Sequence, residues 1–148
     1  MDYTNYYEVE LEWAAGRKGL MSSPALYDSI EVATPPEFPK GIAGIWSPDH
    51  LLVAAANSCL MTTFLAIAEN SGLEFVGFHS KASGKLEKID GKYLISEIEL
   101  SPQLQIKSEA FRDKALKVLE KSESACLISN SVKSRIIFKP EISVVQER

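Results

Sequence analysis

Residues 47–59 read Ser-Pro-Asp-His-Leu-Leu-Val-Ala-Ala-Ala-Asn-Ser-Cys and open the longest apolar segment of the chain. Ser47 can cap the free N–H groups of a helix, and Pro48 fits the first helical position because proline lacks an N–H that would be unpaired there. Asp49 would lie in the first turn, where the helix dipole favours a negative charge. We expect a helix from Pro48 to about Asn70.

This predicted helix is apolar on almost every side between Leu51 and Ala68. Such a helix has to be covered all round, which a single chain of 148 residues does poorly. A second subunit laid along the helix would complete the cover. The apolar segment is shorter than the roughly 20 residues of a membrane span and contains polar residues, so we expect a core helix and no membrane partner.

Alternating segments on both sides of the helix predict strands. Residues 6–13 alternate apolar and acidic side chains, as in a half-buried strand. Asp90-Gly91 predicts a tight hairpin turn whose second arm stops at Ser101-Pro102. Further short strands are expected at residues 26–32, 73–78, 135–138 and 142–145.

A second helix is predicted from Ser108, a good cap, to about Ser122, and residues 126–132 indicate a short helical or turn segment. The expected fold class is α+β, with an antiparallel β-sheet packed on a long buried central helix plus a second helix. We expect one domain over residues 1–148, since the length and the 45% hydrophobic content suit a single core.

The charge pattern and the first residues of the chain bear on its partners and its location. The formal net charge is −4, and no basic block is present, so nucleic-acid binding has little support. Residues 1–5 lack the basic-then-apolar form of a signal peptide, and we expect a cytoplasmic location. Cytoplasmic thiols are kept reduced, so a cysteine pair there is reactive or incidental rather than a permanent cross-link.

The two cysteines, Cys59 and Cys126, are the main indication of chemistry. A thiolate attacks a peroxide oxygen to give a sulfenic acid, and a second thiol can then close a disulfide that protects the first from irreversible oxidation. If folding brings the two sulfurs together, the chain has a nucleophile and a partner that resolves its oxidation. The alternative is two buried cysteines that never meet, since free cysteine is among the most buried residue types.

A reactive Cys59 needs a group that keeps its sulfur ionised. Burial raises the pKa of a thiol, and the dipole of the predicted helix fades within its first turn, well before Cys59. Arg17, in the turn at residues 16–19, is the candidate because its charge is permanent, and Asp49 is the candidate to hold Arg17 in a charge-assisted pair. The alternatives are a solvated loop arginine and a favourable first-turn acid.

Other chemistries find little support in the sequence. The two histidines, His50 and His79, form no metal-ligand spacing with the cysteines, and we expect no metal site. His50 would lie about 13 Å from Cys59 along one helix, which argues against a Cys-His hydrolytic pair. The Gly-Arg-Lys-Gly turn at residues 16–19 matches no phosphate-binding glycine loop.

Three motifs together resemble the OsmC/Ohr family of thiol-dependent peroxidases. Residues 47–59 are similar to the family's proline-acid-x-leucine-leucine prelude, in which a cysteine follows ten positions after the acid. Residues 126–130, Cys-Leu-Ile-Ser-Asn, are similar to its second-cysteine motif, and residues 16–19 resemble its turn after the first strand. Two positions depart from the pattern and favour an OsmC-like branch: the Ohr branch has glutamate in place of Asp49, and the second motif usually has proline in place of Leu127.

The resemblance implies a peroxidatic role for Cys59, a resolving role for Cys126, and Arg17 as the residue that stabilises the thiolate, with Asp49 beside it. It also implies an intertwined homodimer with both active sites at the subunit interface. The implied substrates are organic hydroperoxides, and the implied reductants are small or lipoyl dithiols, with no bound cofactor.

Two other functions stay open from the sequence. A long central helix against an antiparallel sheet in a dimer also describes hot-dog thioesterases, whose acyl-CoA turnover would survive the loss of both cysteines. A non-catalytic binding module would hold a hydrophobic ligand in an apolar dimer cleft and keep two inert thiols.

Overall fold

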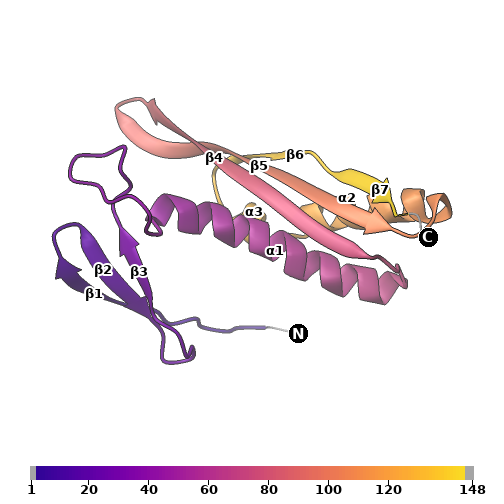
Figure 1. The fold of residues 1–148 in the computed structure, drawn as a ribbon, viewed down its shortest axis with the longest axis horizontal. Helices are drawn as coiled ribbons and strands as arrows, with labels where there is room; N and C mark the ends of the chain where they lie inside the picture. The colour runs from indigo at the N-terminus through magenta and orange to yellow at the C-terminus, as the bar shows by residue number, and fades with distance from the viewer. Residues whose placement is uncertain (1–2, 146–148) are drawn as a thin grey trace. The chain divides into compact units, whose positions relative to one another are not determined.

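The computed structural model describes residues 3–145 and groups the chain into two compact units, residues 1–51 and 52–148. The first unit holds a three-stranded sheet and the start of helix α1, and the second holds the rest of α1, a four-stranded sheet and the remaining helices (Figure 1). The α+β class predicted from the sequence is confirmed. The single domain over residues 1–148 stays a prediction.

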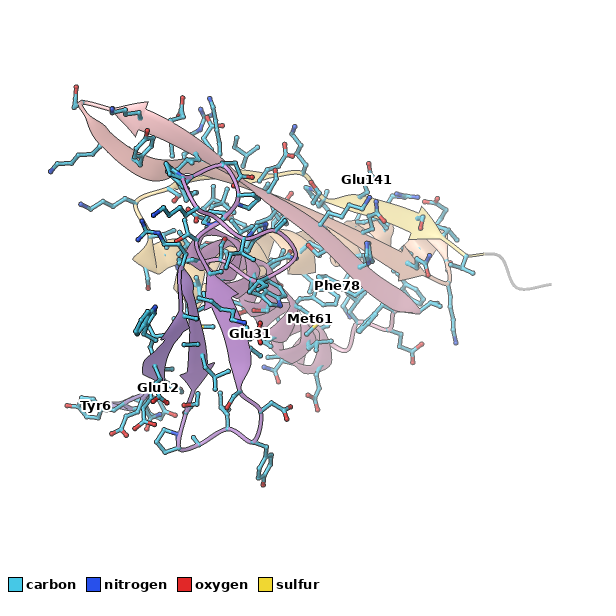
Figure 2. The ribbon with its side chains drawn as sticks, turned by 60° about the vertical axis from the view of Figure 1, so that its left-hand side comes forward. Tyr6, Glu12, Glu31, Met61, Phe78 and Glu141 are labelled. Atoms are coloured by element: carbon cyan, nitrogen blue, oxygen red, sulfur yellow. The ribbon has the colours of Figure 1, made fainter. Side chains whose placement is uncertain are left out.

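The sheet of the first unit is antiparallel, in the order β1-β2-β3. Its strands are β1 (Glu10–Ala15), β2 (Lys18–Ser22) and β3 (Ile30–Ala33). Gly16 and Arg17 form the two-residue turn between β1 and β2, and Gly16 takes a φ of 55° that suits glycine. Strand β2 was not predicted. Figure 2 draws Glu12 on β1 and Glu31 on β3, the two edge strands of this sheet.

The prediction of a half-buried strand over residues 6–13 is wrong in its burial. The strand begins at Glu10, and all six of its residues are exposed within the single chain. Leu11 is 68% exposed and Trp13 is 75% exposed. The alternation predicted from the sequence therefore produces a row of apolar side chains that stays exposed within the single chain.

Helix α1 (Pro48–Ser71) starts and ends where the sequence predicts. The Ser47 hydroxyl accepts a hydrogen bond from the His50 backbone N–H at 3.1 Å, which is the expected cap. Asp49 lies in the first turn. Gly72, with a φ of 68°, follows the last helical residue.

The chain buries α1 along one stripe rather than all round. The buried side chains recur every four residues: Ala56, Leu60, Phe64 and Ala68. Met61 and Leu65 stay 40% and 42% exposed, so the predicted all-round cover is absent within the described residues of the single chain. Among residues 3–145, α1 is the one helix long and apolar enough to cross a membrane, a test that the core helices of soluble proteins also meet.

The sheet of the second unit is built on a long hairpin of β4 (Gly77–Ile89) and β5 (Lys92–Ile106). Asp90 and Gly91 both have positive φ, 51° and 79°, which confirms the predicted turn. The last strands, β6 (Arg135–Phe138) and β7 (Glu141–Val144), both pair with β5 in parallel. The sheet is therefore mixed, and the prediction of a purely antiparallel sheet needs correction at this edge.

Strand β5 continues through Pro102, where the sequence predicted it to stop. Proline cannot donate to a strand neighbour. The parallel pairing with β6 covers β5 up to Leu100, however, and the pairing with β7 starts only at Gln103. Pro102 lies between these two pairings and is tolerated there. At the other end of the hairpin, the strand predicted over residues 73–78 begins only at Gly77.

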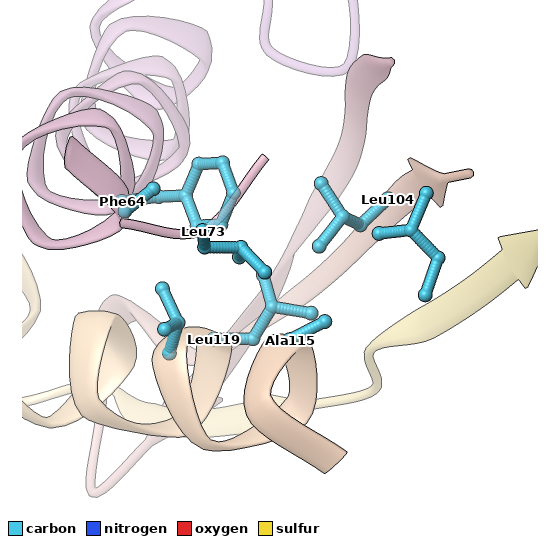
Figure 3. Packing of buried hydrophobic residues seen from close by; sticks show 8 residues of the cluster. Phe64, Leu73, Leu104, Ala115 and Leu119 are labelled. Carbon is cyan, nitrogen blue, oxygen red and sulfur yellow. The ribbon is translucent and has the colours of Figure 1, made fainter. Parts of the chain in front are cut away.

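The helices that follow agree with the sequence. Ser108 caps a short 3-10 turn, η1 (Glu109–Phe111), which leads into α2 (Arg112–Ser124), and α3 (Leu127–Ser131) follows directly. Two buried clusters join these helices to α1 and the sheet. One joins α1, β5 and α2 through residues that include Phe64, Leu104, Ala115 and Leu119 (Figure 3). The other joins Ala56 and Leu60 of α1 to β5, and Ile128 and Val132 pack against it from α3 and its C-cap.

Candidate active site

Folding brings Cys59 and Cys126 into direct interaction, although 67 positions separate them. Cys59 lies on α1, next to the buried Leu60, and is partly exposed. Cys126 is fully buried and forms the N-cap of α3, which Ile128 holds against the cluster around Ala56. Both cysteines are free thiols. The alternative of two cysteines that never meet is therefore excluded.

A polar pair fixes α1 against the sheet two residues before Cys59. The Asn57 side chain donates to the Ser80 carbonyl at 3.0 Å, and the Ser80 hydroxyl donates back to Asn57 Oδ1 at 2.6 Å. A buried or half-buried amide needs such partners, and here they come from β4. Together with the Ala56–Leu60 packing, this pair sets the rotation of α1 that turns Cys59 toward α3.

The thiol of Cys59 is more acidic than an ordinary cysteine. Desolvation by partial burial raises its pKa, but four hydrogen-bonding groups together lower the pKa below the usual value. These groups are the backbone N–H of Ile128, the Cys126 thiol, the Thr63 hydroxyl and the backbone N–H of Leu127. The Thr63 Oγ1 atom lies 3.9 Å from the Cys59 sulfur, one helical turn further along α1. The first turn of α3 thus supplies donors that the dipole of α1 cannot.

Cys126 is shifted in the opposite direction. Desolvation raises its pKa, and the neighbouring Cys59 adds to the rise through hydrogen bonding and through charge repulsion. Ser129 opposes this rise with its side chain and its backbone N–H, without cancelling it. The Ser129 hydroxyl donates to the Cys126 sulfur at 3.3 Å, and the Cys126 thiol lies 3.9 Å from the Ala56 carbonyl. Cys59 therefore ionises more readily than Cys126.

Arg17 and Asp49 both belong to the first unit and line one cavity there, of about 660 Å³. Arg17 is the second residue of the β1–β2 turn, and its carbonyl accepts from Thr34 at 3.3 Å. Apolar side chains make up much of the rest of the lining: Leu11, Trp13, Val32 and Phe38. Among residues 3–145, no ion pair joins Arg17 to Asp49. The cavity brings the two predicted residues to one place but does not pair them.

Several groups around the two thiols were not predicted from the sequence. Thr63 and Ser129 contact the sulfurs, and Leu127 and Ile128 contribute backbone N–H groups. The spacing of four residues between Cys59 and Thr63 on a helix is a signal that could have identified Thr63. No sequence signal identifies the backbone donors, since they depend on where α3 packs.

The histidines take no part in this cluster. His50 Nδ1 lies 2.7 Å from the Ser47 hydroxyl at the start of α1, and its ring contacts Trp46 edge-on. Within residues 3–145, no group of three or more histidine, cysteine, aspartate or glutamate side chains is placed to hold a metal ion.

The amino-acid sequence is similar to a known protein family and to a known protein. The family model described as OsmC-like protein matches residues 41–141, which include α1 and both cysteines. The chain is 28% identical over 145 residues to the uncharacterized protein YmaD of Bacillus subtilis, with 95% of each protein covered.

Solved structures share the fold, including the following two. An OsmC-like protein of unknown function from Vibrio cholerae matches with a TM-score of 0.82 at 21% identity, over 93% of this chain and 99% of that one. An organic hydroperoxide resistance protein from Elizabethkingia anophelis matches with a TM-score of 0.77 at 19% identity, over 98% of this chain and 100% of that one.

Proposed function

This chain belongs to the OsmC-like protein family, and we propose that it is a thiol-dependent peroxidase that reduces organic hydroperoxides to alcohols. The observation that carries the proposal is the direct interaction of two free thiols whose pKa values are shifted in opposite directions, lowered for Cys59 and raised for the buried Cys126. The fold shared with a hydroperoxide resistance protein supports the choice of substrate class.

The proposed reaction begins at the partly exposed Cys59. Its thiolate attacks one oxygen of the hydroperoxide, the O–O bond breaks, and the alkoxide leaves and takes up a proton to become an alcohol. Cys59 is thereby oxidised to a sulfenic acid. Cys126 then attacks the Cys59 sulfur, the disulfide forms, and the hydroxyl group leaves as water with the proton of the Cys126 thiol. An external dithiol reduces the disulfide, and two free thiols return.

The proposed reductant is a small or lipoyl dithiol, because the disulfide has to be reached by a compact reagent that can form its own ring on oxidation. The reaction needs no bound cofactor, since both electrons pass through sulfur. A cytoplasmic location would keep such dithiols available and reduced.

We also propose that Arg17 and Asp49 serve the same reaction. Arg17 would add a permanent positive charge that favours the Cys59 thiolate, and Asp49 would orient it in place of the glutamate of the Ohr branch. Their presence on the wall of one cavity supports this assignment.

The active form is proposed to be a homodimer with the two sites at its interface. Apolar side chains left exposed in the single chain support this proposal: Leu11 and Trp13 on β1, and Met61 and Leu65 on α1. Burial of such side chains by a second copy would be favourable at about 25 cal/mol per Å² of apolar surface.

Steady-state turnover of cumene hydroperoxide with dihydrolipoamide tests the function. The wild-type protein should turn over, Cys59→Ser should be inactive, and Cys126→Ser should give a single burst followed by overoxidation of Cys59. Undiminished peroxidase activity of Cys59→Ser would overturn the proposal. Acyl-CoA hydrolysis that survives the loss of both cysteines would favour the thioesterase, and thiols that do not respond to peroxide would favour a binding module.

A further inference from the structure

Ser129 is the side chain that contacts the second sulfur, and the reaction proposed above leaves it without a role. Its hydroxyl donates to Cys126 Sγ at 3.3 Å, and Ser129 is itself buried. A buried hydroxyl group is costly without a partner, so this hydrogen bond is a fixed feature of the folded chain. Ser131, two residues further on in α3, instead donates to the Leu127 carbonyl at 2.8 Å and is exposed.

Disulfide closure requires Cys126 to ionise, and its surroundings in the reduced protein oppose this ionisation. The attacking sulfur has to be a thiolate, yet Cys126 is fully buried and faces Cys59, whose negative charge repels a second one. Among the described residues, Cys59 on α1 is the titratable group that influences Cys126, and the Cys126 sulfur forms its other hydrogen bonds with the Ala56 carbonyl and Ser129.

Oxidation of Cys59 makes the ionisation of Cys126 more favourable. A sulfenic acid is neutral at the sulfur, so the charge repulsion from Cys59 disappears at the moment when Cys126 has to ionise. What then remains around Cys126 is burial, which opposes the thiolate, and the hydrogen bonding from Ser129, which favours it. A hydrogen bond to a charged group is stronger than one to a neutral group, so the Ser129 contact strengthens as the thiolate forms.

We propose that the Ser129 hydroxyl is the positioning group that stabilises the Cys126 thiolate during disulfide closure, and that oxidation of Cys59 is the event that allows this thiolate to form. The inference rests on the proposed peroxidase function. In the closing step the Cys126 thiolate displaces hydroxide from the Cys59 sulfenic acid, the S–S bond forms, and the hydroxide takes up the proton that Cys126 released. Ser129 keeps its own proton throughout.

A test that does not depend on peroxide uses the Cys59→Ser background, in which Cys126 is the only thiol and residue 59 is neutral. Ultraviolet absorbance of the thiolate against pH, corrected with the Cys59→Ser/Cys126→Ser variant, reports the ionisation of Cys126 alone. Adding Ser129→Ala should raise the midpoint by about one pH unit, a tenfold change in the equilibrium. Adding Ser129→Thr should restore the midpoint, and adding Ser131→Ala should leave it unchanged.

The kinetic arm uses otherwise wild-type protein and cumene hydroperoxide with an acid quench and mass spectrometry. Ser129→Ala should oxidise Cys59 at close to the wild-type rate but close the disulfide about tenfold more slowly at neutral pH. An unchanged midpoint in the first arm would overturn the role of Ser129, and so would equal slowing of both steps in the second, which indicates a merely structural effect. Absence of Cys59 oxidation in the wild-type protein would instead overturn the peroxidase proposal, and the first arm would still decide the role of Ser129.

Discussion

The buried Cys126 faces Cys59 from the N-cap of α3, and each sulfur shifts the ionisation of the other. Hydrogen bonding from Cys126 helps to lower the pKa of Cys59, and the presence of Cys59 helps to raise the pKa of Cys126. The two thiols thus titrate as a pair, with Cys59 ionising first. This asymmetry supports the attacking role proposed for Cys59 and the resolving role proposed for Cys126.

The rate of reaction with hydroperoxide should rise as the pH increases through the pKa of Cys59, because only the thiolate attacks. Since that pKa is lowered, the midpoint of the rate profile should lie below that of glutathione measured in the same buffers. Stopped-flow measurement of the first oxidation step against pH gives both profiles. A midpoint equal to or above that of glutathione would contradict the site geometry.

Leu127→Pro should make Cys59 less acidic. Leu127 is the first residue of α3, and its N–H is one of the donors that lower the pKa of Cys59. Proline removes that N–H but suits the first helical position, so α3 should be retained. We expect the midpoint of Cys59 alkylation by iodoacetamide to move upward, with Leu127→Ala, which keeps the N–H, as the control. Equal midpoints for the two variants would show that this donor has no effect.

Thr63→Val should slow the attack of Cys59 by a few fold at neutral pH. The substitution keeps the shape of the side chain and removes the hydroxyl that lies 3.9 Å from the Cys59 sulfur. A typical hydrogen bond contributes about 1 kcal/mol net, and a hydrogen bond to a charged acceptor contributes more. Because this contact is long, its contribution should be smaller than that of a usual hydrogen bond to a charged acceptor. The matched control is Thr62→Val, because Thr62 donates to the Cys59 carbonyl at 3.1 Å and not to the sulfur. Similar rates for the two variants would exclude a role for Thr63.

Gly84→Ala should destabilise the second unit. A Cβ atom at Gly84 on β4 would lie 2.5 Å from Val53 Cγ2 on α1, closer than two carbon atoms can approach. Overpacking of this kind typically costs 1 to 3 kcal/mol, which urea denaturation can measure. Val53→Ala in the same chain should recover part of the loss, because it removes the atom in the way. A double variant less stable than both single variants would show that the clash is not the cause.

The sequence predicts well those features of the fold that depend on neighbouring residues. Ser47 and Pro48 start α1, and Asp90-Gly91 turn the long hairpin, because caps and tight turns are decided within a few residues. The passage of β5 through Pro102 could not be predicted, since it depends on the interval between its pairings with β6 and β7.

At the candidate site, too, the features that depend on nearby residues are predicted better than those that depend on tertiary packing. The pairing of Cys59 with Cys126 was expected from a resemblance between short motifs, and the geometry agrees. The sequence indicates the cation of Arg17 as the group that ionises Cys59, since a charged side chain can be identified from sequence alone. The donors at Leu127 and Ile128 are backbone groups, whose effect depends on the packing of a five-residue helix against α1.

Reaction of the fully reduced protein with one equivalent of cumene hydroperoxide tests the central claim most directly. Counting of free thiols and mass spectrometry of the digested protein then identify the product. We predict the loss of both thiols and a disulfide that joins Cys59 to Cys126 within one chain. Two thiols that survive the treatment, or a Cys59 sulfinic acid beside an unreacted Cys126, would contradict the claim.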